Sequence, residues 1–353
     1  MIQRRKDMNC INPVVNVSRN CVTALVIMMI VPVAGILGQS KTGTTIGQFT
    51  LIDPSSRISA MGGAGVTSTD EAMASFYNVG ALGALQRTDI QFSYNSWLAG
   101  ISLNYAMAAV KILDNASAVV TMTQLSSGDI DVATVDQPLG TGEKYNVTDL
   151  ELGLGFGMKM TDKFSFGVQV NYISERIWHS SVAVFGINLG TLYQLSPDGL
   201  RIGASLTNFG TKDHFAGTDL KIRYDLDPTR YGDNSSIPGE ISTDYYALPL
   251  VFRVGLGYPV TIDGSNVVNV GVDALHPSDN SESVNVGAEW VFNKFLAARI
   301  GYQSLFLQDS EVGLTAGGGV MFEGDGYDLH FDYAWAANGR LGNVQRITLG
   351  IGL

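Results

Sequence analysis

The feature that most constrains this chain is an alternation of apolar with polar or small residues, repeated from about residue 89 to the last residue. Successive side chains of a β-strand point to opposite faces, so a strand with apolar surroundings on one face only alternates in this way. Near the end of the chain every second residue is apolar: Tyr327, Leu329, Phe331, Tyr333 and Trp335. The pattern predicts an all-β fold, a transmembrane antiparallel β-barrel of the outer-membrane type.

About fourteen strands can be laid out in this way, and the first three are the least regular. Their apolar positions, such as Phe252, Val254 and Leu256, are expected to face lipid. An arginine at position 254 should therefore be costly, whereas Gly255→Ser, on the opposite face, should be mild. None of these segments contains the roughly 18 apolar residues that suggest a spanning helix.

The connections between these strands alternate in length. Short turns are expected at residues 161–163, 196–199, 263–265, 293–294 and 323–326, and the longest connections at about 126–146 and 208–245. Outer-membrane barrels have short periplasmic turns and longer external loops. An even strand number with this pattern predicts both chain termini on the periplasmic side.

Composition supports a lipid-facing barrel over a soluble enzyme, because 41 residues are Gly and only 16% are charged. A secreted β-sandwich or β-propeller is the alternative. Removing a leader with four basic residues and one acidic residue from a chain of net charge −11 leaves −14. Such acidity argues against a nucleic-acid partner, which needs basic patches.

Residues 1–40 have the features of a secretory signal peptide: a basic start, an apolar run from Cys21 to Leu37 and small residues before Lys41. A transmembrane anchor is the alternative, although the apolar run is barely long enough for a helix that spans a membrane. Both cysteines, Cys10 and Cys21, lie in this leader. Disulfides, thiolate–zinc sites and a Cys nucleophile are therefore not expected in the remainder.

No catalytic, cofactor-binding or metal site is predicted, and the chain is not expected to be an enzyme. The four histidines are scattered, and His330 is expected to face the lumen, where it is a poor partner for a nucleophile at a lipid surface. Acidic pairs at 129 and 131 or at 225 and 227 could bind Ca²⁺ or be solvated loop residues. The glycines at 153, 155 and 157 lie within a strand and are expected to line the lumen.

The segment before the barrel, residues 41–87, does not alternate and is expected to be a short N-terminal hatch, with the barrel at 88–353. Apolar residues at helical spacing from 70 to 85 predict a helix that Thr69 or Asp70 could cap. Irregular backbone cannot face lipid, so this segment must lie inside or beneath the barrel. It could simply fill the lumen, or act as a gate or docking site.

The same segment resembles the N-terminal signature of the PorV/PorQ family, and the stretch 332–350 resembles the closing hairpin of that family. The signature positions here are Arg57, Met61, Gly62, Gly63, Asp70, Asn78 and Leu82. Val79 departs from the pattern, because the family usually has Pro there, and Val does not fix the backbone. The family is similar to FadL-type barrels, which have 14 strands and a hatch, so the resemblance implies this fold in the cell outer membrane.

Three hypotheses follow: a purely structural barrel, and the two functions described next. The resemblance implies an accessory of type IX protein secretion or surface-protein attachment, with secretion components or exported proteins as partners. The alternative is FadL-like passive transport of a hydrophobic small molecule. The loop of residues 208–245 carries the binding candidates Phe215, Tyr224 and Tyr231, although the loop could instead fold over the barrel mouth.

Overall fold

The computed structural model describes residues 42–69, 71–196, 198–227, 229 and 236–353. The expected signal peptide, residues 1–40, lies outside the described residues, and so do the candidate residues Asp70 and Tyr231.

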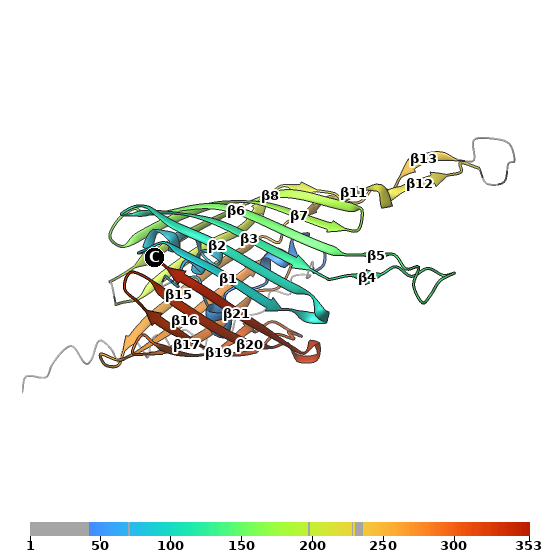
Figure 1. The fold of residues 1–353 in the computed structure, drawn as a ribbon. Coiled ribbons are helices and arrows are strands. Elements are labelled where there is room, and N and C mark those ends of the chain that lie inside the picture. Colours follow the sequence, from blue (N-terminus) through green and yellow to red (C-terminus); the bar gives the residue numbers. More distant parts are fainter. Residues whose placement is uncertain (1–41, 70, 197, 228, 230–235) are drawn as a thin grey trace, which may run out of the picture. The chain divides into compact units, whose positions relative to one another are not determined.

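Within the described part of the chain, fourteen long strands form a closed antiparallel barrel, as predicted (Figure 1). The first strand pairs with the last, and the pairing of β8 with β9 completes the ring. The wall strands are β1 (Asp89–Ser96), β2 (Ser102–Leu113), β3 (Ala116–Ser126), β6 (Val147–Lys159), β7 (Phe164–Ile177), β8 (Ser180–Gln194), β9 (Arg201–Gly210), β15 (Val251–Thr261), β16 (Asn266–Pro277), β17 (Ser283–Phe292), β18 (Leu296–Leu305), β19 (Leu314–Glu323), β20 (Asp328–Ala337) and β21 (Asn343–Gly352).

The remaining elements are short. The helices are η1 (Gln48–Leu51), α2 (Ser56–Ala60), η2 (Ala72–Phe76), η3 (Val79–Ala84), η4 (Leu98–Gly100), η5 (Thr218–Leu220) and η6 (Gly339–Leu341). The small strands are β4 (Ile130–Asp131), β5 (Lys144–Tyr145), β10 (Lys212–Asp213), β11 (Ala216–Gly217), β12 (Lys221–Tyr224), β13 (Ile237–Glu240) and β14 (Tyr246–Ala247). No helix of the described residues is long and apolar enough to cross a membrane.

The wall has an apolar outer face and a polar inner face, in the predicted register. On β15, Phe252, Val254 and Leu256 are 44%, 39% and 41% exposed, whereas Arg253 between them is 8% exposed. The same alternation runs along most of the other wall strands, with β19 less regular, and His330 faces the lumen as expected. A closed barrel with an apolar belt satisfies its backbone internally and offers lipid an apolar surface, so this is an outer-membrane protein.

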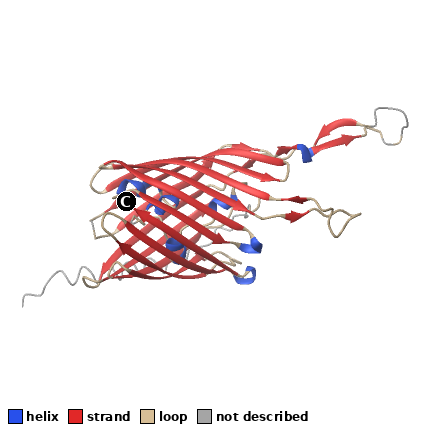
Figure 2. Cartoon of the chain, viewed as in Figure 1, coloured by secondary structure: helices blue, strands red, loops and turns tan. Residues whose placement is uncertain are grey.

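The two ends of the barrel differ as the loop lengths predicted. Short turns join the strands at the end where β21 finishes, and the long connections lie at the other end (Figure 1). There the hairpins β4–β5 and β12–β13 extend away from the wall (Figure 2). By the rule for outer-membrane barrels, the short-turn end is periplasmic and the long-loop end is external.

The first described residues lie at the external end; the N-terminus itself lies outside the described residues, so the prediction that both termini are periplasmic is not tested there. Ile46 N donates to Ala247 O (3.0 Å), Thr45 Oγ1 to Asp279 Oδ2 (2.7 Å) and Gly47 N to Glu175 Oε1 (2.5 Å). All three acceptors lie at or near the external ends of wall strands. Because β1 starts at the periplasmic end, residues 42–87 must run through the whole lumen, which strand counting alone cannot reveal.

This path predicts that residue 44 can be labelled from outside the cell. Both cysteines of the sequence precede residue 42, so a Thr44→Cys variant has one cysteine in its described residues. We expect a membrane-impermeant maleimide to label it in intact cells, because Thr44 is exposed at the external end. Gly264→Cys, in the β15–β16 turn, is the matched control and should react only after the outer membrane is permeabilised. The opposite labelling pattern would reverse the orientation.

Residues 71–85 form two 3₁₀ helices, η2 and η3, rather than the single helix that the spacing predicted. Asn78 breaks the run because its backbone is extended (φ −154°, ψ 106°) and its side chain accepts from Gly80 N (3.0 Å). A side chain that captures nearby backbone groups competes with helix propagation. The expected N-cap also differs, since Glu71 precedes η2 and makes no side-chain cap.

Candidate functional site in the barrel lumen

The lumen is occupied by residues 42–87, which we call the N-terminal segment, and its backbone lies directly against the wall. Inward-facing glycines make this approach possible, because a Cβ at each would meet a backbone or Cβ atom of the segment within 3 Å. The wall glycines that share this property are Gly157, Gly167, Gly190, Gly203, Gly255, Gly287, Gly301 and Gly317. The glycine-rich inner face is thus a cradle for the segment.

The signature residues Met61 and Gly62 dock at an irregularity of the wall. The β17–β18 register shifts between Val284 and Val286, and a Cβ on Gly62 would lie 2.6 Å from Val286 O and 2.8 Å from Tyr302 O. Gly62 has φ +68°, a conformation that favours glycine. Its N–H donates to Thr315 Oγ1 (3.0 Å), which fixes this turn of the segment.

The cradle predicts that alanine is destabilising at wall glycines that contact the segment and tolerated at wall glycines that do not. In Gly287→Ala the new Cβ would lie 2.6 Å from Met61 C and 2.7 Å from Met61 Cα, so the segment must shift. We expect a loss of about 1–3 kcal/mol, the usual cost of overpacking, measured from the temperature at which the folded gel band disappears. Gly318→Ala is the matched control, because its Cβ would approach only Ala297 O, at 3.2 Å. Equal effects of the two substitutions would contradict the docking.

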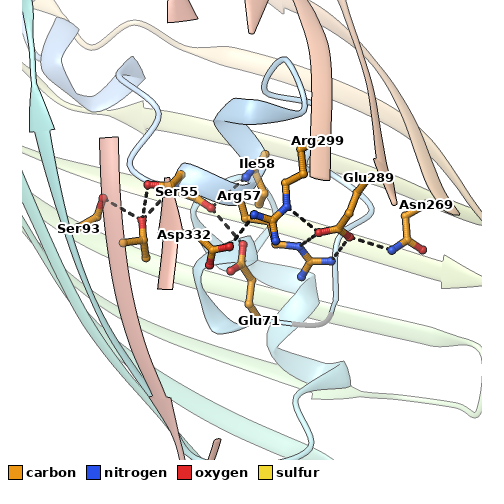
Figure 3. Close-up of polar contacts among 11 residues, drawn as sticks. Ser55, Arg57, Ile58, Glu71, Ser93, Asn269, Glu289, Arg299 and Asp332 are labelled. Atoms are coloured by element: carbon orange, nitrogen blue, oxygen red, sulfur yellow. Dashed lines mark hydrogen bonds and ion pairs between the residues drawn. The ribbon is translucent and has the colours of Figure 1, made fainter. Parts of the chain in front are cut away.

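Arg57 forms a buried ion pair between the segment and the wall (Figure 3). Its guanidinium makes a two-pronged contact with Glu289, Nε to Oε1 at 2.8 Å and Nη2 to Oε2 at 2.6 Å. Arg299 Nε also donates to Glu289 Oε1 (2.8 Å), and Arg299 Nη1 to Asp332 Oδ1 (2.5 Å). Glu289 is 1% exposed, so this chain of charges is shielded from water and salt screens it little. We call these four residues the charge latch.

Glu71 lies beside the latch and belongs to the segment itself. Ser55 Oγ donates to Glu71 Oε1 (3.1 Å), and the same Ser55 oxygen accepts from Ile58 N to cap α2 (Figure 3). Ser55 thus links Glu71 to the first turn of α2.

A second polar anchor holds the stretch before α2. Asp53 O accepts from Arg346 Nε (3.0 Å) and from Asn95 Nδ2 (3.2 Å), and Gln303 Nε2 donates to Asp53 Oδ2 (2.5 Å). The anchor therefore ties the segment to three strands that lie far apart in the sequence.

Asn78 anchors the corner at which the family pattern has Pro after Asn. Its Nδ2 donates to Val66 O (2.8 Å) and to Thr191 O (2.9 Å), while its Oδ1 caps η3. Val79 supplies a backbone contact to the glycine cradle, and Leu82 packs with Tyr105 and other buried apolar residues. The side chain of Asn78 therefore fixes this corner without a proline.

The loop candidates do not form one surface. Phe215 is half-buried and packs with Tyr246 against an apolar cluster at the external mouth, so it belongs to the closure of that mouth. Tyr224 lies on the β12–β13 hairpin and is 51% exposed. Tyr231 lies outside the described residues. Phe215 and Tyr224 thus have different surroundings, which sequence position could not distinguish.

Sequence patterns identified Arg57 but not its partners in the latch. The pairing of Glu289 with Arg299 follows from the short β17–β18 turn, and hairpin register could have revealed it. The contacts from Arg57 to Glu289 and from Arg299 to Asp332 join distant segments, and no local pattern signals them. In the described residues no group of three or more His, Cys, Asp or Glu side chains is placed to hold a metal ion.

No protein-family model and no curated protein matches the chain. Solved structures do match. The Pseudomonas putida toluene transporter TodX aligns with a TM-score of 0.55 and 14% identity over 84% of this chain and 96% of TodX. The Ralstonia pickettii toluene transporter TbuX gives 0.53 and 14% over 85% and 97%. A Pseudomonas aeruginosa FadL homologue gives 0.51 and 11% over 82% and 95%.

The fold is FadL-like. At these identities the likeness concerns the fold alone, and the PorV/PorQ resemblance has no support from a family match. Two of these structures are titled as toluene transporters, and another matching structure, CymD, is titled as a monoaromatic hydrocarbon channel.

Proposed function

We propose that this protein is a passive transporter of small molecules across the outer membrane, with the N-terminal segment as its gate. The observation that carries the proposal is that a separate segment runs through the lumen and is docked on glycines of the wall. A barrel of about fourteen strands lies between the small barrels that side chains fill and the porins that hold a channel. Displacing the segment would therefore open a path.

Two spaces beside the segment support this proposal. A cavity of about 380 Å³ lies at the periplasmic end, between residues 84–87 and the wall around Lys159 and Lys163. A much smaller one, of about 10 Å³, lies between the segment and the wall farther up the lumen. The segment lines both spaces, through Thr50 and Phe76 in the smaller and residues 84–87 in the larger, so its movement is the step that transport needs. The solved relatives that are titled toluene transporters make transport the preferred function for this fold.

A reversible tether tests the gate. The ideal Cβ of Gly271 lies 3.4 Å from Ala64 Cβ, close to the Cβ separation of about 3.5–4.5 Å in disulfides. The Ala64→Cys/Gly271→Cys variant should lock the segment to β16 when oxidised. We expect entry of radiolabelled D-arabinose or toluene into outer-membrane vesicles from a porin-deficient host to stop on oxidation and to return with dithiothreitol.

The two single-cysteine variants control for the substitutions and should not respond to oxidant. If the locked protein still passes solute, the segment is not the gate. If neither solute enters faster with the unmodified protein than with empty membranes, the proposed transport function is wrong.

An accessory role in type IX secretion or surface-protein attachment is the second proposal, and the β12–β13 hairpin favours it. The hairpin extends from the external end and exposes Ile222, Tyr224 and Leu226, with Leu226 73% exposed. Exposed apolar and aromatic side chains are typical of contact surfaces. Its base is tied to the barrel, since Asp219 accepts from His179 N (3.0 Å).

Removing the hairpin tests this second role with little disturbance of the barrel. Ile241 N donates to Leu220 O (2.8 Å), so the two ends are already adjacent and residues 221–240 can be replaced by a short glycine link. Loss of co-purifying exported proteins from native outer membranes would support the role. Unchanged co-purification with faster solute entry would instead make this loop a lid.

A further inference from the structure

The small cavity in the lumen is lined almost entirely by polar side chains, which bears on the class of solute. It lies beneath η1, with Thr50 and Phe76 of the N-terminal segment on one side and wall strands from β2 to β15 on the other. Three buried wall residues define its polar character: Glu151, Gln169 and Asn188, each less than 9% exposed. Phe76 and Tyr105 supply an aromatic edge, with ring centroids 6.0 Å apart.

Each of these three side chains forms a hydrogen bond to a neighbouring wall residue through one of its polar atoms. Glu151 Oε2 accepts from Thr123 Oγ1 (3.1 Å), Gln169 Nε2 donates to Thr121 Oγ1 (3.1 Å), and Asn188 Oδ1 accepts from Asn208 N (2.8 Å). In the described part of the chain, the hydrogen bonds of these three side chains all involve the atoms just named, which leaves Glu151 Oε1, Gln169 Oε1 and Asn188 Nδ2 available to a ligand. The cavity therefore offers acceptors and a donor that the fold does not use.

The wall beside this cavity adds further hydrogen-bonding groups. Arg253 lines it and is fixed by a bond from Nη1 to Thr207 Oγ1 (2.8 Å). Asn171 Nδ2, next to Gln169, is a buried donor without a partner in the described part of the chain. A carboxylate, a guanidinium and several amides around one space suit a ligand that both donates and accepts. An apolar ligand would leave these groups without water or a partner, which costs free energy.

We propose that this cavity is part of a binding site for a small, polar, hydroxylated solute of the sugar class, and that such a solute rather than a hydrocarbon is transported. The inference rests on the transport function proposed above and names its substrate class. A space of about 10 Å³ holds about one water molecule, so the solute enters only as the segment withdraws. Thr50 Oγ1 accepts a hydrogen bond from Asn208 Nδ2 (2.8 Å), and a solute hydroxyl then replaces it as the acceptor.

Parallel entry of two solutes tests the inference. Radiolabelled D-arabinose and toluene are offered to outer-membrane vesicles from a porin-deficient host that carries the full chain, with empty vesicles as the blank. We expect arabinose entry to rise above the blank and toluene entry to stay at it. Faster toluene entry with no arabinose entry overturns the polar class and leaves transport intact. No entry of either solute overturns the transport function and this inference with it.

Two substitutions in the cavity test the site itself. Gln169→Leu and Thr121→Val remove hydrogen-bonding groups, and each should slow arabinose entry about fivefold, the equivalent of one lost hydrogen bond. Val170→Leu, one residue along β7 and 49% exposed to lipid, is the matched control and should have no effect. Heat-modifiable migration on gels checks that each variant is folded. Arabinose entry that is unchanged in both folded cavity variants overturns the assignment of this site.

Discussion

Replacing Glu289 with alanine should destabilise the barrel and loosen the N-terminal segment at once. Glu289 is the carboxylate that Arg57 of the segment and Arg299 of the wall share, and its side chain is 1% exposed. Removing one partner of a buried ion pair leaves charge without compensation and costs about 3–5 kcal/mol. We expect a lower temperature for loss of the folded gel band and a higher ion conductance in planar bilayers.

The exposed pair Arg340–Glu311 gives the matched control. It lies in the external loops, and Arg340 is 88% exposed, so water and salt already screen it. Glu311→Ala should therefore change neither the gel transition nor the conductance. If Glu289→Ala is stable and as silent in conductance as Glu311→Ala, the charge latch does not hold the segment in place.

The barrel could be predicted from the sequence because its signal is local. Lipid on one side and a polar lumen on the other impose a period of two on every wall strand, so Phe252, Val254 and Leu256 reveal their face without knowledge of their neighbours. Turn lengths then gave the two ends of the barrel. The pairing of Glu289 with Arg299 was also within reach, since a short hairpin fixes its own register.

The path of the N-terminal segment could not be predicted, because it depends on contacts between residues far apart in the sequence, such as Arg57 and Glu289, 232 positions apart. Helical spacing at 72–82 suggested one helix, but the bonds from Asn78 to Val66 O and Thr191 O divide it. The same gap in knowledge explains the wrong expectation for Gly255→Ser. A side chain there would overlap Asp273 and lie 2.8 Å from Val66 Cβ, so the substitution is not mild.

The inward-facing glycines of the wall have a role that the alternation of the sequence does not reveal. The sequence indicated that Gly157 and its neighbours face the lumen, which is correct, and a lumen lined by glycine could be read as merely narrow. In the structure that face is where backbone meets backbone: a Cβ on Gly157 would lie 2.5 Å from Leu82 Cβ. The glycine cradle and the N-terminal segment are therefore complementary in shape. Only the three-dimensional structure shows which glycine contacts which residue of the segment.

Val254→Arg should be the most damaging single change on the lipid face of β15. Val254 lies within the outward series from Phe252 to Tyr258 and pairs with Ala204 on β9 and Ala274 on β16, so its side chain meets acyl chains rather than protein. An arginine near the bilayer midplane costs about 2–4 kcal/mol in such barrels, falling toward the interfaces.

The expected result is a lower yield of folded protein in lipid and a lower unfolding midpoint in urea. Val254→Leu keeps the apolar face and should match the unmodified protein, which separates the effect of charge from that of size. Because Gly255 is packed against the N-terminal segment, a lumen-side substitution cannot serve as the silent control, and the comparison must stay at position 254. If arginine and leucine there are tolerated equally, Val254 does not face lipid and the register of β15 must differ by one residue.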